Sequence, residues 1–212
     1  NMKVKIEAGR ALLYETAVAV DMKDGIEEHV EKHPDEAKTM RDELKKYSAL
    51  AGLLTPICKA WNTEIANEVA YDGIQIHGGT GYMKEFNAER HYRDARITNI
   101  YEGTTQLQVV AAIGGVILRT LDPMIKKLAS LPYEGALERM ANELAKMHKK
   151  HLEAVKFVAE KKDSNYHDLM GRPLVDNETY IFVGYLMLRD ALKNPARAVL
   201  AEKYVLYSIP EF

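Results

Sequence analysis

Residues 75–106 read QIHGGTGYMKEFNAERHYRDARITNIYEGTTQ, and two breaks within this stretch decide how the chain is organised. The first break is Gly78–Gly81, where glycines end one helical pattern because they adopt the backbone conformations that close a helix. The second break is Asn99–Thr104, after which a new helical pattern begins. A short helix is predicted between them, over residues 88–98. The stretch therefore predicts three helices joined by two turns, with no β-alternation.

Two long helices are predicted on the N-terminal side of this stretch. The first covers residues 3–31, where apolar residues fall on one stripe and Glu15 is its one polar member. A turn at His33-Pro34 separates it from the second, over residues 36–75, because the residue before a proline disfavours helix. Pro56 lies inside the second helix and is expected to kink or split it.

The C-terminal side of the stretch is also predicted to be helical. A helix over residues 105–119 is followed by a linker between Pro123 and Pro132, and a long amphipathic helix is predicted from Glu134 onward. Turns are then predicted at 163–165 and 171–173, and the last two helices at 178–192 and 195–207.

These patterns contain no βαβ unit and no tandem repeat, so the predicted fold class is all-α. Residues 1–122 are predicted to form a four-helix-type up-and-down bundle, and residues 123–212 a smaller helical extension. The chain opens almost directly in helical periodicity, which is expected of a fragment of a longer protein.

The composition favours an ordinary globular protein of 212 residues with a net charge of −2. This charge argues against a nucleic-acid partner, which requires a basic face. Cys58, the single cysteine, lies in an apolar stretch and is predicted to be a buried, inert thiol. We find no apolar run as long as a membrane span, no signal peptide and no metal-ligand motif, so a cytoplasmic location is expected.

Glu102 is the candidate catalytic residue. Ile100 and Tyr101 precede it and are expected to exclude water from its carboxylate, which would strengthen it as a base. Gly103 allows a sharp turn, and the helix that begins at Thr105 directs its N-terminal N–H groups toward this position. Taken alone, a glutamate before a glycine in such a break is more typical of a solvated loop acid.

The segments Gln75–Tyr82 and Arg93–Gln106, in this order and at this spacing, resemble the C-terminal signature of the acyl-CoA dehydrogenase family. The resemblance covers residues 1–120, and the later residues resemble an extra helical region of a longer subgroup. It implies an FAD-dependent enzyme that dehydrogenates the α and β carbons of an acyl-CoA thioester. The resemblance also implies that Glu102 removes the α-proton, that its backbone N–H binds the thioester oxygen, and that Gly103 lies against the substrate.

The resemblance also implies which residues contact FAD. Those near the first break would contact an FAD held by a neighbouring subunit, and those near the second would hydrogen-bond the flavin cofactor: Gln75, Ile76, His77, Gly78 and Gly79, and Thr104, Thr105 and Gln106. Without the resemblance, the glycines indicate a helix C-cap and a turn, since no strand precedes them as a dinucleotide-binding loop requires. Arg93 and Asp94 are expected to tie the short helix to its neighbours.

Partners follow from the same resemblance: an acyl-CoA substrate, an electron-transferring flavoprotein, and further copies of the chain in a homodimer or homotetramer built through the bundle. The resemblance implies an N-terminal helical domain and a middle β-rich domain before this region. The middle domain holds much of the flavin ring, so the isolated chain is expected to be inactive. An acyl-CoA oxidase with the same base is an alternative. A non-catalytic scaffold or nucleic-acid-associated protein is another, against which Glu102 and the near-neutral charge argue. The sequence does not reveal the acyl chain length.

Overall fold

The computed structural model describes residues 1–161 and 163–212, and its regular elements in these residues are all helical. They are α1 (Met2–Lys32), the 3-10 turn η1 (Pro34–Glu36), α2 (Ala37–His77), α3 (Gly79–Tyr82), α4 (Ala88–Thr98), α5 (Thr105–Ile117), α6 (Asp122–Ala129), α7 (Gly135–Glu160), α8 (Ser164–Lys193), the 3-10 turn η2 (Pro195–Arg197) and α9 (Ala198–Ser208). The predicted all-α fold class is therefore confirmed.

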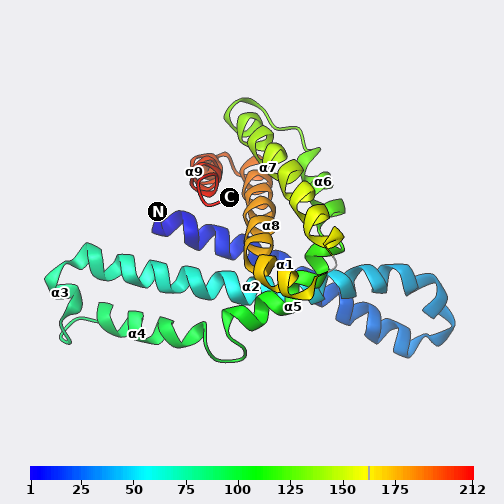
Figure 1. The fold of residues 1–212 in the computed structure, drawn as a ribbon, viewed down its shortest axis with the longest axis horizontal. Helices are drawn as coiled ribbons and strands as arrows, with labels where there is room; N and C mark the ends of the chain where they lie inside the picture. The colour runs from blue at the N-terminus through cyan, green and yellow to red at the C-terminus, as the bar shows by residue number, and fades with distance from the viewer. Residues whose placement is uncertain (162) are drawn as a thin grey trace.

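The N-terminal half is built around the long antiparallel pair α1 and α2, and α4 runs back along α2 (Figure 1). Buried apolar side chains of α1, α2 and α5 join these helices, among them Leu12, Leu54 and Val116, each 0% exposed. Helix α5 approaches α2 closely at Gly115, where an added Cβ would lie 2.9 Å from Leu53 Cδ1. The small residue thus allows the helices to pack without displacing the core.

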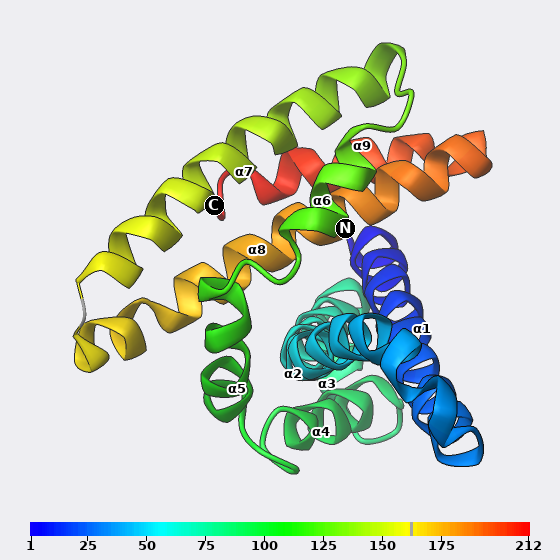
Figure 2. The ribbon, with the colours of Figure 1, turned by 90° about the vertical axis from the view of Figure 1, so that its right-hand side faces the viewer.

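Helices α6 to α9 form a second group that runs across the first (Figures 1 and 2). Helix α8 contacts α1, α2, α5, α6, α7 and α9, and Phe182 and Leu186 in its middle are fully buried. At Gly184 an added Cβ would lie 2.7 Å from Leu144 Cδ2 of α7. One hydrophobic cluster runs from Val4 in α1 to Val205 in α9, so the two groups share a core. The domain boundary at residue 122 stays a prediction.

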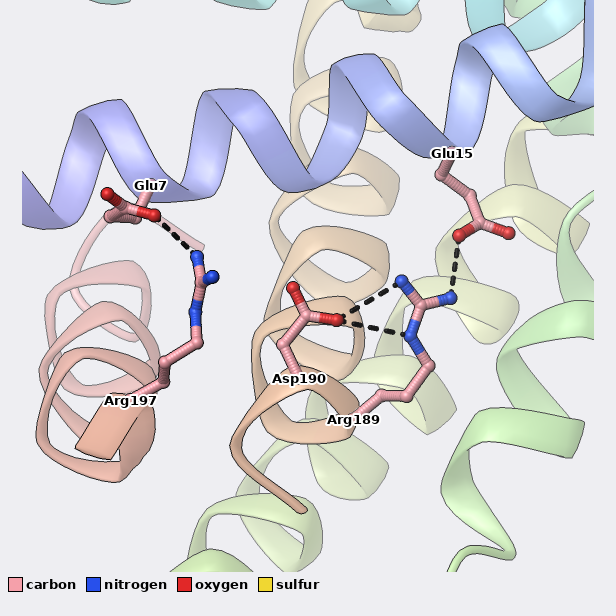
Figure 3. A network of polar contacts seen from close by, with 5 residues as sticks. All are labelled: Glu7, Glu15, Arg189, Asp190 and Arg197. Atoms are coloured by element: carbon pink, nitrogen blue, oxygen red, sulfur yellow. Dashed lines mark hydrogen bonds and ion pairs between the residues drawn. The ribbon is translucent and has the colours of Figure 1, made fainter. Parts of the chain in front are cut away.

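Two arginines of the C-terminal region pair with glutamates of α1 (Figure 3). Arg189 Nη1 donates to Glu15 Oε2 at 2.6 Å, and the same guanidinium contacts Asp190 Oδ1 at 3.3 Å. Arg197 pairs with Glu7 of α1. The Glu15 side chain is only 13% exposed. The partly buried Arg189 guanidinium, rather than solvent, therefore accounts for a charged residue on the apolar stripe of α1.

Two predictions about prolines are corrected, and the expected kink at Pro56 stays a prediction. Residues 171–173 form no turn, because α8 passes through Pro173 without a break. The lost backbone hydrogen bond costs about 3 kcal/mol, which the burial of neighbouring apolar residues such as Leu174 and Val175 offsets. The predicted linker between Pro123 and Pro132 contains α6, with Pro123 in its first turn, where proline is tolerated. Pro56 is buried and does not split α2.

Cys58 is buried, as predicted, and burial raises the pKa of its thiol. No single helix in the described part of the chain is both long and apolar enough to cross a membrane. The consecutive helices α5 and α6 pass that test only as a pair and are bent by 72° at their junction.

A polar pair lies in the core between α7 and α8. His151 is 1% exposed and Glu178 is 3% exposed, and His151 Nε2 lies 3.9 Å from Glu178 Oε1. Burial lowers the pKa of His151 to about 4, with smaller contributions from His148 and Arg119. Burial raises the pKa of Glu178 to about 8, with a smaller contribution from Asp122. The apolar surroundings therefore keep both side chains neutral near pH 6.

We predict that the stability of the fold decreases as pH rises from about 6.5 to 8, and that Glu178→Gln removes this decrease. In this window Glu178 is protonated in the folded chain and ionised in the unfolded chain, so unfolding releases a proton and rising pH favours it. His151 is neutral in the folded chain, but in the unfolded chain it is half protonated at about pH 6.5 and largely neutral by about pH 7.5, so its opposing contribution fades across this window. The slope from Glu178 is up to about 1.4 kcal/mol per pH unit, or roughly 3–6 °C in melting temperature per pH unit.

Thermal melts followed by circular dichroism at several pH values would measure this slope. Glu153→Gln, an exposed glutamate on α7, is the matched control and should keep the wild-type slope. Equal slopes in Glu178→Gln and wild type would contradict the prediction.

Candidate active site

The turn between α4 and α5 carries Glu102. Glu102 has a φ of 53° and Gly103 a φ of 94°, in the left-handed region that non-glycine residues rarely adopt. A hydrogen bond from Thr105 N to Asn99 O (3.3 Å) closes the turn, and Gln108 Nε2 donates to Glu102 O at 3.0 Å. Left-handed backbone at a residue such as Glu102 costs about 1–3 kcal/mol and is typical of functional sites.

Polar side chains of α2 hold this turn. Lys59 Nζ donates to Gly103 O at 2.6 Å and lies 5.8 Å from the centre of the Tyr101 ring. Further along α2, Glu64 Oε1 accepts a hydrogen bond from Thr105 Oγ1 at 2.6 Å. Both hydrogen bonds hold residues that follow Glu102, so α2 supports the C-terminal part of the turn.

A third residue of α2 holds the end of α4. Asn67 Nδ2 donates to Ala95 O at 3.0 Å. Arg93 and Asp94 were expected to tie this helix to its neighbours, but both are exposed and neither forms an ion pair within the described residues. That expectation is wrong, because the backbone carbonyl of Ala95, rather than a charged side chain, makes the contact.

The Glu102 carboxylate is exposed in this structure. Ile100 is 44% exposed and Tyr101 is 51% exposed, so the expected exclusion of water by these two side chains is wrong for this chain. The backbone N–H of Glu102 has no acceptor in the described part of the chain. The turn therefore presents a carboxylate and a free N–H donor from the same residue.

The start of α5 uses two of its three predicted cofactor side chains internally. Thr104 caps the helix, since its Oγ1 accepts a hydrogen bond from Leu107 N at 3.4 Å. Thr105 is 8% exposed and its hydroxyl donates to Glu64. Gln106 is exposed and forms no side-chain hydrogen bond within the described residues. Of the three, Gln106 is thus the side chain that is open to a cofactor.

The other predicted cofactor residues lie at the C-terminal end of α2, and all are exposed: Gln75, Ile76, His77, Gly78 and Gly79. Gly78 has a φ of 60° and ends α2 as a C-cap. Ile76 is 73% exposed although it is apolar, and a Cβ built at Gly79 would meet nothing within 4 Å. This end of α2 therefore offers an open, partly apolar surface.

The two groups of predicted site residues do not meet within one chain. Figure 1 shows α3, which begins at Gly79, at one tip of the molecule. The turn that carries Glu102 lies at the opposite end of α4. Helix α4 has 11 residues, a length of about 16 Å. Within one chain the two groups are therefore separated by about the length of α4.

A groove of about 970 Å³ lies between α1, α2 and α4, and its walls are mainly apolar. They include Ile6 and Leu13 of α1, which are 40% and 49% exposed, and Phe86, which is 47% exposed. Lys59 lines the groove and its Nζ bonds the Gly103 carbonyl, so this one side chain lies between the groove and the turn that carries Glu102. We did not predict this groove from the sequence. The one signal for it is the pair of exposed apolar residues on α1, Ile6 and Leu13.

Several curated proteins are similar to part of the chain. The 3-methylmercaptopropionyl-CoA dehydrogenase of Ruegeria pomeroyi is 39% identical over 119 residues, or 56% of this chain and 18% of that protein. The Caffeyl-CoA reductase-Etf complex subunit CarC of Acetobacterium woodii is 34% identical over 119 residues, or 56% of this chain and 24% of that protein. The human mitochondrial short-chain specific acyl-CoA dehydrogenase is 43% identical over 84 residues, or 40% of this chain and 19% of that protein.

Two solved structures share the fold of nearly the whole chain. Caenorhabditis elegans ACDH-11 in complex with C11-CoA superposes with a TM-score of 0.77 at 18% identity, over 96% of this chain and 34% of that one. An acyl-CoA dehydrogenase complexed with FAD from Bacillus anthracis superposes with a TM-score of 0.71 at 19% identity. The match covers 97% of this chain and 38% of that one. The chain thus spans about a third of these structures and less than a quarter of the curated relatives above.

Family models cover both groups of helices. The model described as Acyl-CoA dehydrogenase, C-terminal domain, matches residues 1–114 of the 212. A second model, described as Acyl-CoA dehydrogenase C terminal, matches residues 120–211. Together with the helical fold and the turn that carries Glu102, these matches show that the chain belongs to the acyl-CoA dehydrogenase family.

Proposed function

We propose that the intact protein containing this chain is an FAD-dependent acyl-CoA dehydrogenase that introduces a double bond between the α and β carbons of an acyl-CoA thioester. The observation that carries this proposal is the turn at Glu102, which presents a carboxylate and a free backbone N–H side by side. The apolar groove, whose lining includes the Lys59 that bonds this turn, supports an apolar substrate. Protein outside the described residues supplies the rest of the cleft.

The chemistry proposed for Glu102 follows from the acidity of the substrate. The C–H bond beside a thioester carbonyl is a weak acid, so a carboxylate must lie against it to take the proton. As the proton leaves, negative charge develops on the thioester oxygen, and the Glu102 N–H donates a hydrogen bond to it. One such donor contributes about 3 kcal/mol in the transition state. When bound, FAD accepts the hydride that leaves the β carbon, and the α,β double bond forms.

The residues present fit a flat cofactor on two surfaces. Gln106 would hydrogen-bond it near the start of α5, and Thr104 would contribute its backbone N–H, whereas the hydroxyl and the N–H of Thr105 are both used within the chain. The exposed residues 75–79 would bind an FAD that a second copy of the chain holds. Since α4 separates the two surfaces, this arrangement supports a homodimer or homotetramer.

The proposed electron acceptor is an electron-transferring flavoprotein. One relative, CarC, is a subunit of a caffeyl-CoA reductase-Etf complex, which associates this kind of chain with such a flavoprotein. If this acceptor is correct, air should reoxidise the reduced intact protein slowly and an electron-transferring flavoprotein should reoxidise it fast.

Replacing Glu102 by Gln should abolish reduction of the flavin by substrate. We expect anaerobic titration of the intact protein with acyl-CoAs of several lengths to bleach the flavin absorbance. In Glu102→Gln the bleaching rate should fall by about 10²–10⁴-fold, the usual contribution of a general base. Glu138→Gln, an exposed glutamate on α7, is the matched control. Equal bleaching by Glu102→Gln and wild type would assign the base to another residue.

The isolated chain of 212 residues should neither retain FAD in stoichiometric amount nor oxidise acyl-CoA. The physical reason is exposure: residues 75–79, Glu102 and Gln106 are open to solvent, so this chain encloses no flavin ring. Absorbance at flavin wavelengths after gel filtration, compared with the intact protein, measures retention. A 1:1 ratio of FAD to purified chain would overturn this prediction.

Gly79→Ala should weaken FAD retention by the intact protein while leaving the fold unchanged. The added methyl group meets no protein atom within 4 Å, so it obstructs only a ligand that packs against the backbone. Gly25→Ala, a second glycine with open space around it, is the matched control. The measurements are the FAD content after dialysis and the melting temperature of the isolated chain. Unchanged FAD content would remove Gly79 from the cofactor surface.

A further inference from the structure

We propose that Lys59 and Glu64 of α2 are positioning residues, which hold the turn at Glu102 in the shape required for proton removal. This inference rests on the proposed function of Glu102 and adds two residues to that reaction. Neither side chain belongs to the motif that carries the family resemblance. Each contacts the turn from a position about 40 residues earlier in the chain.

The Lys59 ammonium is committed to the turn. Its hydrogen bond to the Gly103 carbonyl is 2.6 Å long, and it lies 5.8 Å from the centre of the Tyr101 ring. It forms no ion pair with a carboxylate within the described residues. A hydrogen bond from a charged donor is about twice as strong as a neutral one. Lys59 therefore fixes the peptide between Gly103 and Thr104, one residue after Glu102.

Glu64 holds the end of the turn, at the first residue of α5. Its Oε1 accepts a hydrogen bond from the Thr105 hydroxyl at 2.6 Å, and Thr105 N in turn donates to Asn99 O across the turn. Glu64 also lines a pocket of about 440 Å³ together with Arg172 and Asp176, so α8 lies near this residue.

Two tethers are needed because the turn is strained. Glu102 and Gly103 both have left-handed φ values, which a free loop would relax. The Lys59 and Glu64 contacts lie on consecutive turns of α2, a helix whose own position the core fixes. A misplacement of about 1 Å in an active site reduces the rate by about 10²-fold. Rigid attachment to α2 is thus the feature that gives the Glu102 carboxylate and N–H a defined position.

The test uses Lys59→Met, Lys59→Arg and Glu64→Gln in the intact protein, with Lys45→Met as the control because Lys45 is exposed on the same helix. We expect the rate of flavin bleaching by acyl-CoA to fall by about 10–100-fold in Lys59→Met and Glu64→Gln. The acyl-CoA dissociation constant should change less than about 3-fold, and Lys59→Arg should recover part of the rate, since it restores a charged donor.

Hydrogen exchange in the isolated chain gives a readout that needs no flavin. The amide of Thr105, bonded across the turn, should exchange faster in Lys59→Met and Glu64→Gln, with no change in melting temperature larger than that of Lys45→Met. Faster exchange with a wild-type bleaching rate would overturn the proposal. A loss confined to acyl-CoA affinity would also overturn it for Lys59, which would then be a substrate contact in the groove.

The two proposals fail in different ways. If Glu102 is not the base, the flavin in Glu102→Gln bleaches as fast as in wild type. The Thr105 amide still exchanges faster in Lys59→Met and Glu64→Gln, but this change then has no bearing on catalysis. If Glu102 is the base and the tethers do not position it, Glu102→Gln alone loses activity while Lys59→Met and Glu64→Gln keep it.

Discussion

Burial of α8 on all sides is the constraint on which the rest of the fold depends. Residues Ile181–Leu188 are all buried, which an amphipathic surface helix cannot achieve, because it exposes one face. The bundle helices α1 and α5 must therefore cover one side of α8, and α7 and α9 the other. This requirement makes one core of the two helical groups. It also explains the partly buried pairs of Arg189 with Glu15 and of Arg197 with Glu7, which lie where the groups meet.

A shared core gives α2 a fixed position, and the candidate site uses α2 as its support. The strained backbone at Glu102 and Gly103 persists because side chains of α2 bond the turn from outside the motif. Strain, tethering and exposure have separate consequences. The first two define where the carboxylate and the N–H lie. Exposure leaves the exclusion of water, which the reaction needs, to surfaces beyond the described residues.

In the proposed function, the two ends of α4 would contribute to the site from different copies of the chain. The end near α3 offers exposed backbone and Ile76, and the end near α5 offers Glu102 and Gln106. A homodimer or homotetramer would bring opposite ends together. In that arrangement the apolar residues that are exposed at both ends would be covered, which gives association an energetic reason as well as a catalytic one.

The sequence by itself determined the features that depend on local stereochemistry. The glycine break at Gly78, the turn before Thr105 and the amphipathic stripe of α1 follow from backbone freedom, capping and periodicity, and the family signature lies in the same short stretch. Only the tertiary structure decided that α8 continues through Pro173, that Glu15 faces Arg189, and that Lys59 and Glu64 hold the turn. The sequence alone does not show whether a proline ends a helix or which group a lysine bonds. The burial that offsets the proline, and the carbonyl that accepts from the lysine, lie far away along the chain and come near only on folding.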